Sequence, residues 1–221
     1  MNLLAIDASS KNISICLEYE GKTIADINQK RLHGASSIIE QIDKCLKKRS
    51  LSLKAFDAFV VGGGPGSFTG LRISFSLIKA FSLALKKPVI SLGSFLSCAY
   101  VLRNKSARIA VISDARRNLI YAASYKVNKG VLRQDAKVRL LGLDEFVKLK
   151  KDYLFITSDS HLRSQVLKDY PKINFYPRDI YPKASNLLPF ARICYNSSKF
   201  TLLDKLKPLY LYPKTCQIRK K

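Results

Sequence analysis

Short apolar runs alternate with longer amphipathic ones along this chain, and the alternation predicts an α/β protein. The first three apolar runs are separated by turn residues and cover residues 3–6, 13–19 and 23–27. Runs of this length predict strands, and Gly21 followed by Lys22 predicts a hairpin, so the three runs predict an antiparallel meander. Apolar residues then recur at helical spacing from Ala35 to Leu46, which predicts the first helix.

A glycine-rich turn follows the next predicted strand, and the first half of the chain is organised around it. The strand covers residues 56–61, and the predicted helix after the turn covers residues 71–85. Between them, residues 62–72 hold five of the ten glycines of the chain. Glycine permits close backbone approach, and the first amides of a helix attract anions. The turn is therefore a candidate phosphate site.

The second half of the chain repeats the beginning of the first. A strand at residues 108–113 leads into Asp114 and Ala115, as the first strand leads into Asp7 and Ala8. A repeat at about half the chain length predicts a duplicated unit, although a chance match remains an alternative. We expect a first unit at residues 1–104, which carries the partner helices, and a second, degenerate unit at residues 105–221. Three antiparallel strands followed by alternating helices and strands indicate the duplicated ribonuclease H-like, actin-like ATPase fold, with the second unit reduced.

Beyond residue 143 the pattern breaks into short pieces. These pieces predict helices near residues 144–149, 161–168 and 184–195, and a strand at residues 153–157. The second unit is therefore expected to hold less helix than the first, and its detailed structure is left open.

Composition points to nucleic acid without locating a site. Thirty-nine Lys and Arg against sixteen Asp and Glu give a formal net charge of +23, which favours polyanions as partners. The lysines are scattered, however, so an ordinary solvated surface is an equal alternative. Five widely spaced cysteines without a CxxC pair indicate reduced thiols in the cytoplasm. We expect a cytoplasmic protein with no membrane partner, because no apolar run approaches the length of a membrane span.

The sequence gives little support for phosphate binding or catalysis by the glycine turn. The turn matches neither GxxxxGK[ST] nor GxGxxG, and the turn after Asp7 lacks the glycine of an actin-like phosphate loop. We interpret Asp7 as a structural residue that bonds its own turn. Ser67 and Thr69 have no histidine base, so we expect them to cap the following helix. The predicted structural turn consists of Asp7, Gly64, Pro65, Gly66, Ser67, Phe68, Thr69, Gly70 and Arg72.

Neither a metal site nor a cofactor site is predicted. The only histidines, His33 and His161, lie far apart and match no metal-binding spacing. We therefore expect no catalytic residue, no cofactor and no metal.

The helix at residues 71–85 is apolar on nearly all sides, whereas a sheet covers only one side of a helix. Either the neighbouring helix or a partner covers the remainder, and we predict a partner. Small residues on this helix would let another helix approach closely, and they are Ser74, Ser76, Ala80, Ser82 and Ala84. The predicted interface consists of Ile38, Ile39, Ile42 and Leu46 in the first helix and Leu71, Phe75, Ile78, Lys79 and Ser82 in the second.

Four sequence segments resemble one known family. The run Gly-Pro-Gly-Ser-Phe-Thr-Gly-Leu-Arg-Ile at residues 64–73, preceded by Leu-Leu-Ala-Ile-Asp at residues 3–7, is similar to the TsaB family, also called YeaZ. The Asp-Ala-Arg-Arg run from Asp114 and the Pro-Leu-Tyr-Leu run from Pro208 are similar to its second hairpin and its C-terminus. This chain has Ala8 and Ser9 after Asp7, and in this it departs from the sequence that is usual in the family.

The resemblance implies a non-catalytic scaffold subunit in bacterial synthesis of threonylcarbamoyladenosine on ANN-reading tRNAs. It implies that the catalytic subunit TsaD binds through the first two helices, at residues 35–46 and 71–85, that the ATPase TsaE joins the complex, and that tRNA is bound through the complex. It leaves open a homodimer of the isolated chain through the same face, nucleotide binding at a subunit junction, and direct contact of the basic surface with tRNA.

Two other functions remain as alternatives from the residues alone. The first is an actin-like ATP-dependent phosphotransferase, which the missing phosphate glycine disfavours. The second is a stand-alone RNA-binding protein, for which tRNA binding undiminished without TsaD would be the deciding sign.

Overall fold

The computed structural model describes residues 1–30 and 34–212. The first half consists of β1 (Leu3–Asp7), β2 (Asn12–Tyr19), β3 (Lys22–Lys30), α1 (Gly34–Lys47), η1 (Leu53–Ala55), β4 (Ala58–Gly62), α2 (Phe68–Leu85), β5 (Val89–Leu92) and α3 (Ser94–Val101). The second half consists of β6 (Arg108–Arg116), β7 (Leu119–Asn128), β8 (Val131–Gly142), α4 (Leu143–Leu149), β9 (Leu154–Ile156), α5 (Ser160–Asp169), η2 (Ala184–Leu187) and α6 (Leu188–Asn196).

The two sheets share one topology. The first has the order β3-β2-β1-β4-β5, in which β1 pairs antiparallel with β2 and parallel with β4. The second has the order β8-β7-β6-β9 with the same directions, since β6 pairs antiparallel with β7 and parallel with β9. At the position of the missing fifth strand, a single parallel bridge joins Phe155 to Phe175. The predicted duplicated, actin-like α/β fold with a reduced second unit is confirmed.

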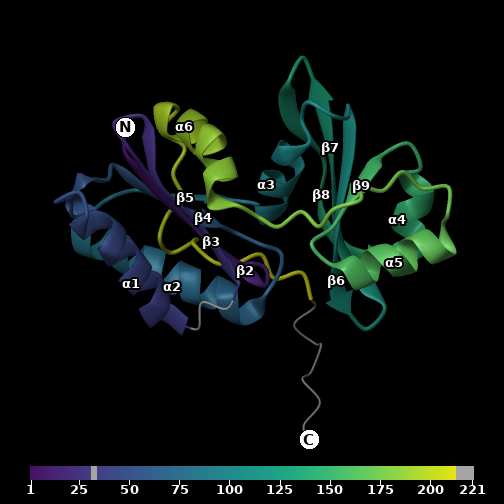
Figure 1. Cartoon of the computed structure of the whole chain (residues 1–221), viewed down its shortest axis with the longest axis horizontal. Helices are drawn as coiled ribbons and strands as arrows, with labels where there is room; N and C mark the ends of the chain where they lie inside the picture. Colours follow the sequence, from purple (N-terminus) through teal and green to yellow (C-terminus); the bar gives the residue numbers. More distant parts are fainter. Residues whose placement is uncertain (31–33, 213–221) are drawn as a thin grey trace, which may run out of the picture.

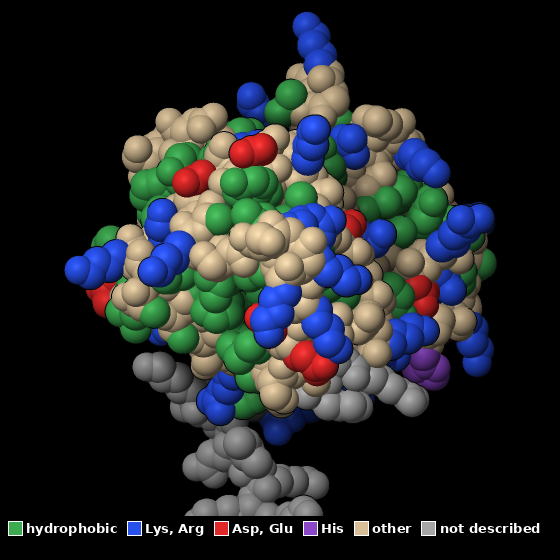
Figure 2. Space-filling view, turned by 60° about the vertical axis from the view of Figure 1, so that its left-hand side comes forward, with side chains coloured by type: hydrophobic (Ala, Val, Ile, Leu, Met, Phe, Trp, Pro, Cys, Tyr) green, Lys and Arg blue, Asp and Glu red, His purple; other side chains and the backbone are tan. Residues whose placement is uncertain are grey.

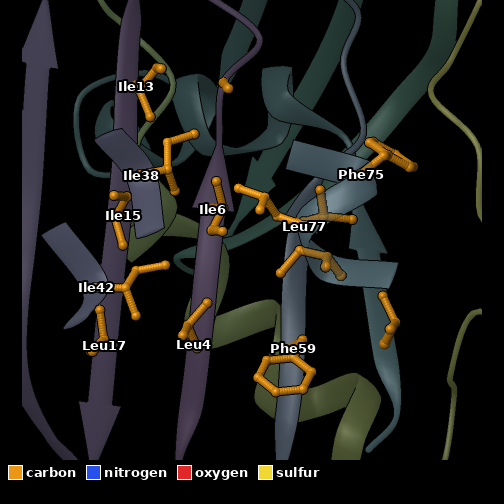
Figure 3. Packing of buried hydrophobic residues seen from close by; sticks show 14 of the residues in the cluster. Leu4, Ile6, Ile13, Ile15, Leu17, Ile38, Ile42, Phe59, Phe75 and Leu77 are labelled. Carbon is orange, nitrogen blue, oxygen red and sulfur yellow. The ribbon is translucent and has the colours of Figure 1, made fainter. Parts of the chain in front are cut away.

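Helices cover both faces of the first sheet (Figure 1). Helices α1 and α2 lie on one face, and α6 lies on the other. Figure 3 shows apolar side chains of the strands and of both helices meeting in the core between them, including Leu4, Ile6, Ile15, Ile38, Ile42 and Leu77. Burial of this kind contributes about 1.5 to 3 kcal/mol for each large aliphatic side chain.

Two helices pack against the sheet of the other half. Phe95 and Cys98 of α3 belong to the core of the second sheet, together with Ile109 of β6. Leu188 and Ala191 of α6 belong to the core of the first sheet, against β1, β4 and β5. Each half therefore completes the core of the other. The boundary between residues 104 and 105 stays a prediction.

Two ion-paired carboxylates join distant elements. Glu18 of β2 is buried and pairs with Arg192 of α6, which fixes that helix on the sheet. Asp135 of β8 accepts hydrogen bonds from Lys150 Nζ at 2.9 Å and from the Tyr153 hydroxyl at 2.7 Å. The Lys126 ammonium, which also pairs with Asp135, is the largest cause of a lowered pKa. Together with the other two donors it holds the pKa of Asp135 well below its usual range.

Helix α2 contains an apolar run as long as a membrane span, which the sequence analysis did not expect. Within the described residues it is long and apolar enough to cross a membrane by length and composition, with a mean hydropathy of 1.3 over 18 residues. The expectation that no run approaches that length was wrong. One side of the helix lies in the core of the first sheet through Leu71, Phe75 and Ile78, so its apolar character has a structural use within the fold.

We predict that Ile78→Asp strongly destabilises the chain, whereas Leu83→Asp on the same helix does not. Ile78 is fully buried and Leu83 is 66% exposed. An unpaired carboxylate in the core is expected to lower the free energy of unfolding by about 3 to 5 kcal/mol. The exposed substitution should cost less than about 1 kcal/mol. Urea denaturation followed by circular dichroism measures both, and equal losses would contradict the assigned orientation of α2.

Candidate functional site

The glycine turn joins the end of β4 to the start of α2. Ser67 is the N-cap of the helix, because its hydroxyl oxygen accepts a hydrogen bond from the Gly70 amide at 3.2 Å. Thr69 lies inside the helix and is exposed. Gly64 and Gly66 have φ angles of +91° and +152°, a region that residues with a side chain rarely adopt. The turn therefore requires glycine at both positions.

The turn lies directly against the loop that follows β1. A Cβ atom on Gly66 would lie 1.9 Å from the Ser9 carbonyl oxygen, and one on Gly70 would lie 2.0 Å from the Ala8 carbonyl oxygen. The Ser67 amide donates to the same Ser9 carbonyl at 2.7 Å. Glycine is needed here for close packing of two backbone segments, which fixes the position and direction of α2.

Asp7 lies buried beneath this contact. Its Oδ1 atom accepts from the Ser9 amide at 2.9 Å and from the Ser9 hydroxyl at 2.6 Å, so the residue bonds its own turn. Its Oδ2 atom has no hydrogen-bond partner among the described residues, and a Cβ atom on Gly62 would lie 2.0 Å from it. Burial raises the pKa of Asp7 above its usual value. The geometry favours a structural carboxyl.

A cleft of about 460 Å³ lies between the two halves. Ser9, Lys11, Ser67 and Asp114 are among its lining residues. Two backbone amides beside the cleft are already bonded within the protein, because the Ser9 amide donates to Asp7 and the Ser67 amide donates to Ser9. The described residues also contain no group of three His, Cys, Asp or Glu that could hold a metal ion. The Ser9 and Ser67 amides are therefore not free to bind a phosphate in this structure.

The four described cysteines are free thiols, and none of them suits nucleophilic chemistry in the cleft. Cys98 lines the cleft and is buried, and burial raises the pKa of its thiol far above the usual value. A thiol in this state carries little thiolate at neutral pH. Cys216 and His33 lie outside the described residues.

The second hairpin faces the cleft with an unusual backbone. Arg116, Arg117 and Asn118 have φ angles of 70°, 55° and 60°, three successive left-handed residues without a glycine. The side chain of Asp114 supports this turn by accepting from the Arg116 amide at 2.8 Å. The Tyr212 hydroxyl donates to the carbonyls of Ala115 and Arg116. The C-terminal segment thus holds the hairpin in place.

The predicted interface residues are mostly part of the chain's own core. The buried members are Ile38, Ile42, Leu46, Leu71, Phe75, Ile78 and Ser82. These seven side chains lie on the sheet-facing stripe of each helix and hold it on the sheet, so they offer little surface to a second folded chain. That they contact a partner stays a prediction. Lys79 is partly exposed, and Ile39 is 45% exposed.

The free face of α2 carries a different set of residues. Its exposed positions recur at helical spacing and are Phe68, Thr69, Arg72, Ser76, Ala80, Leu83 and Ala84. Three of them, Ser76, Ala80 and Ala84, are small and four residues apart, so they form one row along the helix. Small residues in a row allow the backbone of another helix to come close. The remaining small residues, Ser74 and Ser82, are buried and bond backbone carbonyls of Leu71 and Lys87.

Comparison with known proteins places the chain in a family. Residues 26–212 match the family described as TsaD, tRNA N6-adenosine threonylcarbamoyltransferase. The chain is 30% identical to the tRNA threonylcarbamoyladenosine biosynthesis protein TsaB of Bacillus subtilis, over 76% of each of the two chains. The chain belongs to the TsaB family. A further TsaB protein, from Escherichia coli, is 22% identical over 96% of this chain and 94% of its own length.

Solved structures agree with the fold of this TsaB-family chain. YeaZ from Pseudomonas aeruginosa superposes with a TM-score of 0.82, covering 95% of this chain and 99% of that one at 24% identity. At this identity the match bears on the fold alone.

We predict that Gly70→Ala destabilises the chain and that Gly142→Ala does not. The added methyl group at residue 70 would overlap the Ala8 carbonyl, whereas nothing lies within 4 Å of a Cβ atom on Gly142. The expected loss for Gly70→Ala is about 2 kcal/mol or more, against less than about 1 kcal/mol for the control. Urea denaturation compares the two, and a Gly70→Ala protein as stable as the control would contradict the close contact.

The buried Asp7 gives a pH prediction. Because the folded state raises the pKa of this acid, its contribution to stability is complete below the unfolded pKa and is lost as pH rises through the folded pKa. Asp7→Asn removes the titration and keeps an oxygen that can accept from Ser9. The free energy of unfolding of the wild type, relative to Asp7→Asn, should therefore fall as pH rises above the ordinary carboxyl pKa of about 4. Asp204→Asn, an exposed control, should keep the wild-type profile. A constant difference would contradict the raised pKa.

Proposed function

We propose that this chain acts in the synthesis of threonylcarbamoyladenosine on tRNA as a non-catalytic subunit in the cytoplasm. It binds and supports the catalytic subunit TsaD, and the ATPase TsaE joins the complex. The tRNA reaches the chain through this complex, and no membrane takes part. The names of its TsaB relatives support the pathway, and the bonded amides around the cleft favour a supporting role over catalysis by this chain.

The observation that carries the proposal is the free face of α2. An apolar residue that is 66% exposed, Leu83, lies beside the small row of Ser76, Ala80 and Ala84. Ile39 of the adjacent α1 adds a second exposed apolar side chain. A surface of this kind fits an apolar helix of a partner, because small residues admit its backbone and the flanking side chains cover its sides. The same face is available for a homodimer when TsaD is absent.

The phosphotransferase alternative has less support. A kinase of this fold needs backbone amides that are free to bind phosphate, and in this chain the amides of Ser9 and Ser67 are bonded within the protein. The Ser67 contact belongs to the packing of α2 on the loop after β1, and the Ser9 contact lies within that loop. Freeing the Ser67 amide would require that packing to open.

We predict that Ala80→Glu and Leu83→Glu weaken binding to TsaD without unfolding the chain. A carboxylate buried in the contact is expected to cost about 2 kcal/mol or more, roughly a thirtyfold loss of affinity. Leu167→Glu on α5 is the matched control, since this leucine is also exposed on a helix. Co-elution with purified TsaD in size-exclusion chromatography, followed by calorimetric titration, measures the effect. Equal affinity of Ala80→Glu and the control for TsaD would overturn the assigned face.

A further inference from the structure

Two exposed aromatic rings lie together where the C-terminal segment crosses the start of α2. Phe68 is 52% exposed and Tyr210 is 49% exposed, and their ring centroids are 5.5 Å apart. The Arg72 guanidinium lies over the Phe68 ring, 3.8 Å from its centroid. Large apolar rings clustered at a surface commonly mark a binding site. We call Phe68, Arg72 and Tyr210 the stacking cluster.

The backbone on both sides holds the stacking cluster in place. Phe68 is the first residue of α2, whose start is fixed against the loop after β1. The Leu209 amide donates to the Gly63 carbonyl at 3.0 Å, and the Tyr212 hydroxyl donates to the Arg116 carbonyl at 3.2 Å. The segment that carries Tyr210 is therefore bonded on either side of that residue. Rings held in this way lose little freedom when they bind a planar group.

Two hollows adjoin the stacking cluster. One of about 400 Å³ is lined by Phe68, Tyr210 and Arg116 among others. The other, of about 630 Å³, shares Tyr210 and is lined by Lys205 and Lys207. Among the residues that the structure describes, no Asp or Glu lines either hollow. Rings and three cations thus line the two hollows, and one of the cations, Arg116, also pairs with Asp114 at 3.7 Å.

Charge alone does not locate a binding site on this chain. Figure 2 shows Lys and Arg side chains spread over the face in view, with few Asp and Glu among them. The stacking cluster differs from this background because it joins exposed rings to cations. Unpaired bases stack on aromatic rings and on guanidinium planes, while phosphates pair with nearby cations.

We propose that the stacking cluster and the two hollows bind unpaired nucleotides of RNA. Bases stack on Tyr210 and on the Phe68 and Arg72 pair, and phosphates pair with Lys205, Lys207 and Arg116. The proposal rests on the proposed function in that tRNA supplies the RNA. It assigns to this chain a direct contact with tRNA, beside the contact that TsaD makes. A single mononucleotide, or a protein segment, is the competing occupant.

The test measures binding of a fluorescent single-stranded RNA of about ten nucleotides to the full chain by anisotropy, across a salt series. Tyr210→Ala should weaken binding about tenfold or more and leave the salt dependence unchanged, because it removes stacking and no charge. Phe200→Ala is the matched control, since this exposed ring packs only edge-on with Tyr195 among the ring pairs of the described residues. Equal affinity of the two variants would overturn the proposal.

The cations are tested separately. The double variant Lys205→Ala and Lys207→Ala should reduce the slope of log affinity against log salt by up to about two, as expected for two lost phosphate contacts. The control is Lys44→Ala with Lys47→Ala, which removes the same charge from lysines that pair with Glu40 and Asp43 on α1. An equal slope for both double variants would show a diffuse surface effect and overturn the assignment of these lysines.

Two further measurements separate this proposal from the proposed function. Tyr210→Ala should still co-elute with TsaD, because Phe68, the ring that Tyr210 contacts, lies about three helical turns from Ala80 along α2. If Tyr210→Ala loses RNA binding and still co-elutes with TsaD, the result supports RNA binding by the stacking cluster. If the variant still binds RNA and no longer co-elutes with TsaD, the result contradicts the proposal. Ala80→Glu should lose binding to TsaD and keep binding to RNA.

The occupant is tested by competition. Unlabelled AMP that displaces the RNA at equal molar concentration would identify a mononucleotide site and overturn the proposal.

Discussion

The structure depends on one close backbone contact, between the glycine turn and the loop after β1. Gly66 and Gly70 bring the start of α2 against the carbonyls of Ser9 and Ala8, at a separation that a Cβ atom would not allow. Because the contact joins β1 to α2, it sets the direction in which the longest helix leaves the sheet. The direction of α2 in turn decides which of its residues enter the core and which remain on the surface.

The same contact explains why the cleft is poorly suited to phosphate. A phosphate loop keeps its amides free for the ligand, but here the Ser67 amide is bonded to Ser9 and the Ser9 amide to Asp7. Asp7 bonds its own loop and lies buried below it. The loop after β1 and the glycine turn thus use these two amides to hold the helix in place.

The exchange of helices between the halves makes the molecule one cooperative unit. Helix α6 completes the first core, and α3 completes the second, so neither sheet is covered by its own half alone. The C-terminal segment adds a third connection, since it bonds Gly63 on one side and the second hairpin on the other. Connections of this kind hold the free face of α2 and the stacking cluster at fixed positions on one body.

The sequence by itself determined the elements, the repeat and the family. Period-two and period-3.6 patterns located the strands and helices, because each element must bury one apolar face, and the run at residues 64–73 carried the family resemblance. Only the tertiary structure decided which side of α2 is free, because a helix that is apolar on nearly all sides has no periodic signal to orient it. For the same reason Phe75 and Ile78 were assigned to a partner, although they lie in the core. The contact of Phe68 with Tyr210 could not be predicted from the sequence, since only the fold brings together two residues that are more than half the chain apart.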